Sequence, residues 1–508
     1  MERAVRVTPR GLDLGTEEIP LLSGSIHYWR LDPKLWDHLL DECREMGFRV
    51  LCTYVPWVIH ELEKGKFDFG EKKLEKDLGA FLDLAHSKGL KFIVRAGPHI
   101  NSELTYFGYP KRVLLDPKNQ ARSASGTGVV LPIPPRMFPV PSHFSKNFQD
   151  DAQTFLEALS PIVRPRLHPQ GPIVLLQIDN EWSYFFRYSA YEQDYSEGAL
   201  AEYRDFLKGR YPSISALNSA YGTNYSSFKE AVPPKKFGAR KLSDWPPYLD
   251  WVEAREKMHQ RGLALVKERY ERAGLAGVAT SHNFPVPFPQ SPLDVSACEE
   301  VVDIQGTDHY PKKTDYASLK KEGCLLSGSS RLPFIPEFSS GFFPVPGYPI
   351  LLEDERFTTL ALFMHGLKAI NFYMLVERER WAGSPLTRDG RRREELFGFY
   401  KRLNEVLART QLHRLPKRRE CVLLTNPDAL RITRAASVLP ITNIVVDVGA
   451  VDGEMLVDER DLGFRDKIQI EYGRTFESLF RALSQAHIPF DIANPETVSE
   501  ERLSRYRT

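Results

Sequence analysis

The sequence predicts an α/β fold: a (β/α)8 TIM barrel followed by the beginning of a doubly wound α/β domain. Two observations predict the barrel. Short apolar or β-branched runs recur eight times, and amphipathic segments of helical period separate most of them. Polar and aromatic residues gather at the carboxyl ends of these runs, where the active sites of such barrels lie. An open doubly wound sheet is the alternative, but it does not require eight strands.

The predicted strands are spread over the first 400 residues or so. They lie at residues 21–28, 49–57, 91–99, 172–180, 277–284, 301–310, 333–341 and 369–377. Helices are predicted at residues 32–47, 72–89, 149–164 and 390–410, with a long helical stretch from about 196 to 275. The first helix has clear end signals, because Asp32 stands in capping position before Pro33 and Gly47 follows the last apolar residue.

Two segments interrupt this alternation. Residues 112–146 are rich in Pro, Gly and Ser, and they predict a loop over the barrel mouth. Residues 414–420 (RLPKRRE) are basic and contain a helix breaker, which indicates a domain boundary. We therefore expect a barrel catalytic domain at 1–413 and a partial α/β domain at 414–508. A doubly wound domain needs more strands than this tail supplies, so we expect the chain to be a fragment of a longer protein.

Composition excludes several classes of function. The 508 residues carry 68 Lys and Arg against 67 Asp and Glu, and the net charge of +1 gives no field that would attract nucleic acid. The N-terminus lacks the pattern of a signal peptide, and no stretch has the length of a membrane span. We expect a cytoplasmic protein without a membrane partner. Five scattered cysteines predict neither a disulfide framework nor a structural zinc site.

Two glutamates are the candidate catalytic residues. Glu181 in "QIDNEW" ends the fourth strand, and Glu337 in "PFIPEFSSG" lies at the seventh. Cleavage of a glycosidic bond uses two carboxyl groups, one as an acid and one as a nucleophile or base. A surface or salt-bridged role is the ordinary fate of a Glu. Two Glu at such strand ends, each within apolar and aromatic sequence, favour catalysis instead.

Histidine and arginine residues at the barrel mouth allow further interpretations. His27, His99, His282 and His309 raise the possibility of a zinc site, but no HxH or HxxxH pair is present and sugar hydroxyls are served equally well by imidazole. We therefore predict neither a catalytic metal nor a cofactor. Arg95, at the end of the third strand, either holds a carboxylate ionised or forms a structural ion pair.

Six motifs carry a resemblance to a known family. In order they are "LLSGSIHYWR", "YVPWVIHE", "RAGPHINSE", "QIDNEW", "PFIPEFSSG" and "NFYML". They resemble glycoside hydrolase family 35, whose members are mostly retaining, exo-acting β-galactosidases of clan A. The resemblance spans about residues 20–410. The third motif departs from it, because the family usually has GPYICAEW where this chain has "GPHINSELTYF".

Other segments resemble glycoside hydrolase family 42. Residues 199–225 are similar to the strand-four insertion of family 42 β-galactosidases. The tail around "QAHIPFDIANPETV" resembles the second domain of that family, which mediates trimer contacts. The resemblance implies a homo-oligomer, trimer or dimer, for the full-length protein. Archaeal exo-β-glucosaminidases show the same mixture of the two families.

The resemblance to family 35 implies an activity and its catalytic residues. The expected enzyme is an exo-acting, retaining β-glycosidase that removes terminal β-linked galactose from a small carbohydrate substrate by double displacement. Glu181 matches the general acid/base of the family, and Glu337 matches the nucleophile. No cofactor is implied.

The same resemblance implies five substrate-binding residues. Asn180 matches the amide that binds the sugar 2-hydroxyl, and Tyr54 and Glu103 match positions that hold other hydroxyls. Tyr373 matches an aromatic residue beside the sugar, and Tyr310 matches a tyrosine that is bonded to the nucleophile. Ordinary core or rim packing is the alternative for Tyr54, Glu103, Tyr310 and Tyr373.

Two other functions stay open at this point. An exo-β-glucosaminidase would use the same two glutamates, but it would need a carboxylate near the ammonium group at C2. The chain has the neutral Asn180 there, with Asp179 next to it. A non-catalytic sugar-binding protein on an inherited barrel is the other alternative, and the presence of both glutamates argues against it.

Overall fold

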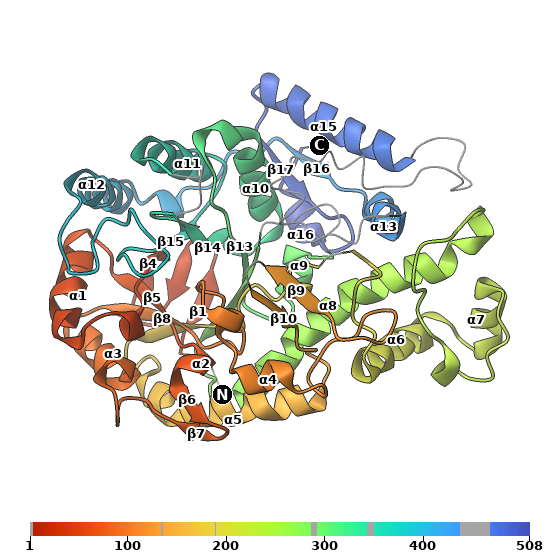
Figure 1. The fold of residues 1–508 in the computed structure, drawn as a ribbon. Helices are drawn as coiled ribbons and strands as arrows, with labels where there is room; N and C mark the ends of the chain where they lie inside the picture. The colour runs from red at the N-terminus through yellow and green to blue at the C-terminus, as the bar shows by residue number, and fades with distance from the viewer. Residues whose placement is uncertain are drawn as a thin grey trace.

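The computed structural model describes residues 4–133, 136–187, 189–285, 292–342, 350–436 and 468–507, and a parallel barrel lies at its centre (Figure 1). Eight strands pair in the order β13-β12-β11-β8-β5-β4-β15-β14, every pair parallel. Their bounds are β4 (Leu22–Ser25), β5 (Val50–Tyr54), β8 (Lys91–Arg95), β11 (Ile173–Gln177), β12 (Ala279–Phe284), β13 (Ile304–Thr307), β14 (Phe334–Ser339) and β15 (Ala369–Tyr373). The predicted (β/α)8 barrel is confirmed.

The two ends of this strand order meet, which closes the barrel. The backbone N–H of His309, just after β13, donates to the carbonyl oxygen of Glu337 in β14 at 2.9 Å. Gly306 of β13 faces Pro336 so closely that a Cβ atom there would clash with the proline ring. Closure therefore requires glycine, which has no side chain, at position 306. The closing contact lies directly beside Glu337.

The strands form where the sequence is apolar without interruption. In β5 and β11, every residue is buried. Parallel strands in a barrel have side chains inside and helices outside, so both of their faces are covered and their sequences show no polar alternation. This is why continuous apolar runs such as IVLLQ marked the strands correctly.

Helices surround the barrel (Figure 1). The longer ones are α1 (Trp36–Glu45), α3 (Leu78–Ser87), α5 (Lys146–Val163), α6 (Glu197–Arg210), α7 (Ile214–Tyr221), α8 (Pro246–Arg272), α10 (Tyr316–Ser329), α11 (Leu352–Met364) and α12 (Glu394–Thr410). Short ones are α2 (Trp57–His60), α4 (Lys111–Leu115) and α9 (Val295–Cys298). As predicted, Asp32 caps the first helical segment by accepting from the backbone N–H of Lys34. Among the helices of the described ranges, none is long and apolar enough to cross a membrane.

Some small β elements were not predicted. Residues 112–146 were expected to be a loop, but they contain an antiparallel hairpin of β9 (Val130–Ile133) and β10 (Arg136–Pro139). Its prolines indicated a loop, yet an isolated two-stranded ribbon has free edges on which proline is tolerated. Two further antiparallel groups are β1 (Arg6–Thr8), β2 (Gly11–Asp13) and β3 (Glu18–Ile19), and the pair β6 (Glu61–Glu63) and β7 (Lys66–Phe67).

The tail carries a second parallel strand pair. β16 (Cys421–Leu424) pairs with β17 (Phe490–Ala493), and α13 (Pro427–Ala436), α15 (Ile468–Gln485) and α16 (Glu500–Leu503) accompany them. These strands and helices give the described part of the tail an α/β structure. Residues 437–467 lie outside the described part of the chain.

A buried aspartate lies where the tail packs closely against α10 at Gly328. The Asp491 carboxylate in β17 is fully buried and binds Lys417 Nζ at 2.5 Å and Arg419 Nε at 2.6 Å. Tyr506 donates a hydrogen bond to the same carboxylate at 2.8 Å. Arg419 also reaches Ser327 of α10. The basic residues that marked the predicted boundary therefore hold the tail against α10.

Removing the charge of Asp491 should destabilise the protein strongly. Asp491→Asn leaves two cations facing a neutral buried group, and the loss of one partner from a buried ion pair costs about 3 kcal/mol or more. The matched control is Asp150→Asn, because Asp150 pairs with Lys146 on an exposed helix surface, where a pair contributes about 0.5 kcal/mol at most. Urea unfolding of both variants measures the difference. Equal losses would show that Asp491 does not hold the tail.

Candidate active site

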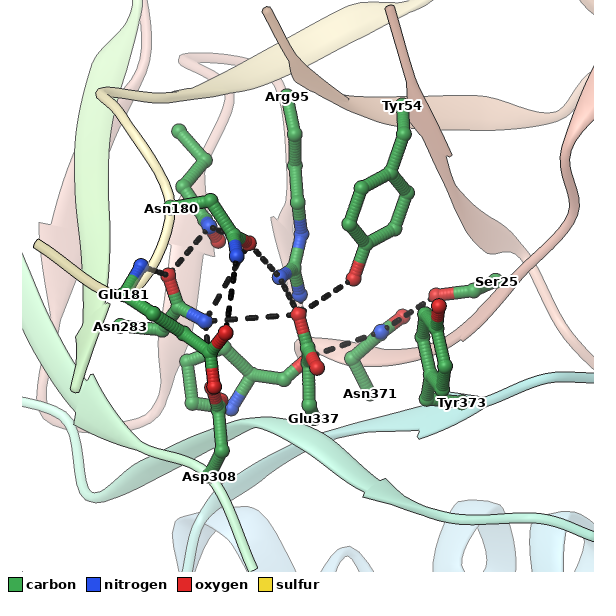
Figure 2. Close-up of polar contacts among 12 residues, drawn as sticks. Ser25, Tyr54, Arg95, Asn180, Glu181, Asn283, Asp308, Glu337, Asn371 and Tyr373 are labelled. Carbon is green, nitrogen blue, oxygen red and sulfur yellow. Dashed lines mark hydrogen bonds and ion pairs between the residues drawn. The ribbon is translucent and has the colours of Figure 1, made fainter. Parts of the chain in front are cut away.

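The carboxyl ends of the strands bring a polar cluster together at one end of the barrel (Figure 2). The chain leaves β11 in a sharp turn, and Asp179 and Glu181 have the positive φ angles of 59° and 47°. Such angles are rare outside glycine and are tolerated where neighbouring groups fix the backbone. Here the Glu181 backbone N–H donates to Asn283 Oδ1 at 3.0 Å. The turn thereby directs Glu181 toward Glu337.

Glu337 is surrounded by hydrogen-bond donors. Arg95 Nη1 and the Tyr54 hydroxyl donate to Oε1 at 2.8 and 2.7 Å, and the Tyr310 hydroxyl donates to Oε2 at 2.7 Å. Asn283 adds a longer contact to Oε1 at 3.4 Å. An ionised carboxylate only accepts hydrogen bonds, and these donors match it on both oxygens. These three close contacts therefore hold the side chain of Glu337 in a fixed orientation.

Arg95 supplies the positive charge of the site. Its side chain is 0% exposed. Burial works against its charge, but Tyr54, Cys52 and Glu337 raise the pKa of Arg95 above its usual value. The guanidinium also donates to the carbonyl oxygen of Pro336 and, through Nε, to Cys52 Sγ at 3.2 Å. Arg95 therefore forms an ion pair with Glu337, and this pairing fits both roles left open for the arginine.

Glu181 has a different environment. It is 8% exposed, and the donors to its carboxyl group are two amides, Asn101 at 3.3 Å and Asn180 at 3.4 Å. Burial and the charge of Glu337 raise the pKa of Glu181 to about 8. Carboxyl oxygens of Glu181 and Glu337 lie within 4.8 Å of each other. Two neighbouring carboxyls whose proton affinities are pushed apart are the arrangement expected of an acid and a nucleophile.

Asn180 and Asn283 connect the two glutamates. Asn180 Oδ1 accepts from Arg95 at 3.4 Å, and its amide nitrogen faces Glu181. Asn283 Oδ1 accepts from Gln177 Nε2 at 2.7 Å, and its amide nitrogen donates to Asp308 at 2.5 Å. Both amides are almost completely buried. They therefore keep the spacing of the acidic groups constant.

The predicted binding residues form two groups. Tyr54, Asn180 and Tyr310 contact the glutamates directly, and the Tyr310 bond to Glu337 agrees with the prediction from the family. Glu103 and Tyr373 lie farther along the mouth, where Tyr373 donates to Glu103 Oε2 at 3.1 Å. The rings of Tyr54 and Tyr373 are 5.7 Å apart, so the two groups are neighbours. The sugar contacts assigned to these residues stay a prediction.

Several residues of the site were missed. Asp308 is buried beside both glutamates, and its position two residues before Tyr310 was a usable signal, because alternate residues of a strand share a face. Arg378, which binds both Glu103 and Tyr373, lies in the segment after β15, where no periodicity marks it.

Among the residues that the structure describes, the four histidines named above, His27, His99, His282 and His309, are not part of a cluster with the spacing of a metal site. His282 Nδ1 contacts Gln305 Oε1 at 3.0 Å, and His27 Nδ1 contacts Arg30 at 2.9 Å. Within the described ranges, the side chains with the spacing of a metal site are the three carboxyls of Glu181, Asp308 and Glu337. One of these carboxyls is already paired with Arg95.

Comparison with known proteins supports the family. Residues 12–127 match the model of the family described as Glycosyl hydrolases family 35. The predicted resemblance to glycoside hydrolase family 35 is confirmed. A β-1,2-glucosyltransferase from Ignavibacterium album is 29% identical over 373 residues, which are 70% of this chain and 50% of that protein. An exo-β-D-glucosaminidase from Pyrococcus horikoshii is 31% identical over 250 residues, 47% of this chain and 31% of that protein. The chain spans half or less of these two relatives.

A solved structure shows the same fold. A GH42 β-galactosidase from G. stearothermophilus superposes with a TM-score of 0.68 at 14% sequence identity. The superposition covers 96% of this chain and 69% of that one. Covering 96% of 508 residues requires part of the tail as well as the barrel, so the likeness in fold extends beyond the barrel.

Glu181 should keep its proton well above the pH at which an ordinary glutamate loses it. With a pKa of about 8, the acid form predominates below that pH and is lost as the pH rises through it. Carbon-13 NMR of protein labelled at the glutamate carboxyl carbons measures this titration, and Glu181→Gln identifies the signal by its disappearance. A midpoint near the ordinary value of about 4.3 would contradict the described environment.

Proposed function

We propose that this chain is a retaining, exo-acting β-glycosidase that cleaves a terminal β-linked sugar by double displacement. One observation carries the proposal: Glu337, whose carboxyl group accepts from Arg95, and Glu181, whose pKa is raised to about 8, have carboxyl oxygens within 4.8 Å of each other. Retaining enzymes hold their two carboxyls about 5 to 5.5 Å apart, whereas inverting ones leave about 6.5 to 9.5 Å for a water molecule. The short spacing supports direct attack by Glu337.

The environments of the two glutamates suit the two steps. In the first, Glu337 attacks the anomeric carbon while Glu181 gives its proton to the departing oxygen. Burial is the larger cause of the raised pKa of Glu181, and the charge of Glu337 is the second. The resulting ester at Glu337 is uncharged, so this second cause disappears and the pKa of Glu181 falls. Glu181 then acts as the base that takes a proton from water, and this water displaces the sugar from Glu337.

A sugar with a neutral 2-hydroxyl, galactose by family resemblance, is the proposed substrate. Asn180 contacts Glu181 and Arg95, the partner of Glu337, and it carries no charge. Asp179 does not supply the carboxylate that a glucosaminide would need. It is fully buried, and its two oxygens accept from the His99 backbone N–H at 2.7 Å and from His143 Nε2 at 2.9 Å.

Glycosyl transfer to another sugar is the second candidate function. The relative that matches 70% of this chain is named a β-1,2-glucosyltransferase. Hydrolysis and transfer share the same sugar ester on the nucleophile and differ in whether water or a sugar hydroxyl attacks it. Product analysis with added acceptor sugars separates the two.

The stereochemistry of the products tests the mechanism. With a nitrophenyl β-galactoside, proton NMR should show the β-sugar first. Glu337→Gly should be nearly inactive, and azide should restore turnover and give the α-glycosyl azide, because the small anion enters the space of the missing nucleophile. Glu181→Ala is the matched control: it keeps Glu337, so azide should instead give the β-glycosyl azide. An α-sugar as the first product of the unmodified protein would overturn double displacement.

Asn180 should matter more for turnover than for binding. The proposed hydrogen bond from Asn180 to the 2-hydroxyl strengthens in the transition state. Asn180→Ala removes this bond, so it should lower kcat by about tenfold or more and change KM less. Asn180→Asp should improve the ratio of glucosaminide to galactoside hydrolysis, because it adds a carboxylate near C2. Nitrophenyl β-galactoside, β-glucoside and β-glucosaminide, assayed side by side, measure both effects. A change confined to KM would remove this role from Asn180.

A further inference from the structure

A third carboxyl group lies beside the two glutamates. Asp308 follows β13 and is 2% exposed, and its carboxyl faces those of Glu181 and Glu337 (Figure 2). Oxygens of the three groups lie within 4.8 Å of one another. Asp308 Oδ2 accepts from Asn283 Nδ2 at 2.5 Å, while Oδ1 is buried and has no hydrogen-bond partner among the described residues. A buried carboxylate oxygen without a donor is unfavourable, whereas a protonated one is not charged.

The balance of charge limits how many of these carboxyls are ionised. Arg95 is the cation of the cluster, and it is committed to Glu337 at 2.8 Å. One guanidinium compensates one carboxylate, and a second carboxylate at this distance would be disfavoured by both burial and repulsion. When Glu337 is ionised, Glu181 and Asp308 therefore each hold a proton.

The groups around Asp308 act in two opposite directions. Glu337 on β14 and Glu181 after β11 oppose a negative charge, while Arg95 on β8 and the Asn283 amide on β12 favour one. Burial and the two glutamates are the larger influences, so the pKa of Asp308 lies well above its usual value.

We propose that Asp308 is a positioning residue that stays protonated in the working pH range and leaves Glu337 as the one anion among the three carboxyls. The inference rests on the proposed glycosidase function. A neutral Asp308 keeps Glu181 from binding its proton too tightly to release it to the leaving oxygen. Asp308 also holds the amide of Asn283, whose oxygen accepts the Glu181 backbone N–H. The residue thus sets both the proton affinity and the position of the acid.

Infrared spectroscopy tests the protonation directly. In wild-type protein at pH 7, the carboxylic acid stretch should contain contributions from Glu181 and Asp308, beside those of Glu299 and Glu355, whose pKa values burial raises to about 7. Glu181→Gln should retain the contribution of Asp308, and adding Asp308→Asn to Glu181→Gln should remove it. An acid stretch that does not weaken when Asp308→Asn is added would overturn the proposal. This readout needs no turnover, so it decides the proposal even if no glycoside is hydrolysed.

The pH dependence of kcat/KM gives the second test. Asp308→Asn is close in shape to a protonated aspartate and keeps an oxygen for Asn283, so we expect kcat/KM within about fivefold of wild type and an alkaline limb moved by less than about half a pH unit. Asp308→Ala removes the acceptor and should lose about tenfold or more. A downward shift of about one unit in Asp308→Asn would show that Asp308 was ionised and had been raising the pKa of Glu181, which would also overturn the proposal.

Discussion

The ion pair between Arg95 and Glu337 is the interaction on which the site depends. A guanidinium with no exposed surface is very unfavourable without a partner, and the donors of Arg95 are committed to Glu337, Pro336 and Cys52. These contacts join β8 to β14 and β5. The ion pair therefore stabilises the packing of these strands, and the strands fix the positions of the two charged groups. The pair also places one negative charge in the cluster, which makes a second one beside it unfavourable and leaves Glu181 with its proton.

Most of the barrel could be predicted because its strands are covered on both faces. Uninterrupted apolar sequence is therefore diagnostic, and each of the eight predicted runs contains an observed strand. The small antiparallel elements could not be predicted in the same way. β3 has two residues, and the β9–β10 hairpin contains prolines. Such elements depend on contacts with the rest of the chain more than on local preference, and the sequence alone does not show those contacts.

The site was predictable where a residue's place on a strand determines its role. Glu181 and Glu337 were selected because they lie toward the carboxyl ends of buried strands, and the structure places their carboxyl groups side by side. Tyr54 was expected at the site, but the bond of its hydroxyl to Glu337, which is 283 positions away in the chain, was not predicted. Which partner a side chain contacts depends on strand register and barrel closure, and a local sequence motif determines neither of them. Asp308 was missed for the same reason, because its importance comes from its neighbours.

The turn after β11 departs from the usual preferences for backbone angles and for burial, and it does so at the same residues. Asp179 and Glu181 have backbone angles that ordinary residues avoid, and both are buried although they are acidic. Each violation has a specific compensation: His143 and the His99 backbone hold Asp179, and the Asn283 side chain holds the Glu181 backbone. If the turn were relaxed and exposed to solvent, Glu181 would be mobile and would have an ordinary proton affinity. The strained and buried turn is therefore what gives a common carboxyl group the fixed position and the retained proton that acid catalysis requires.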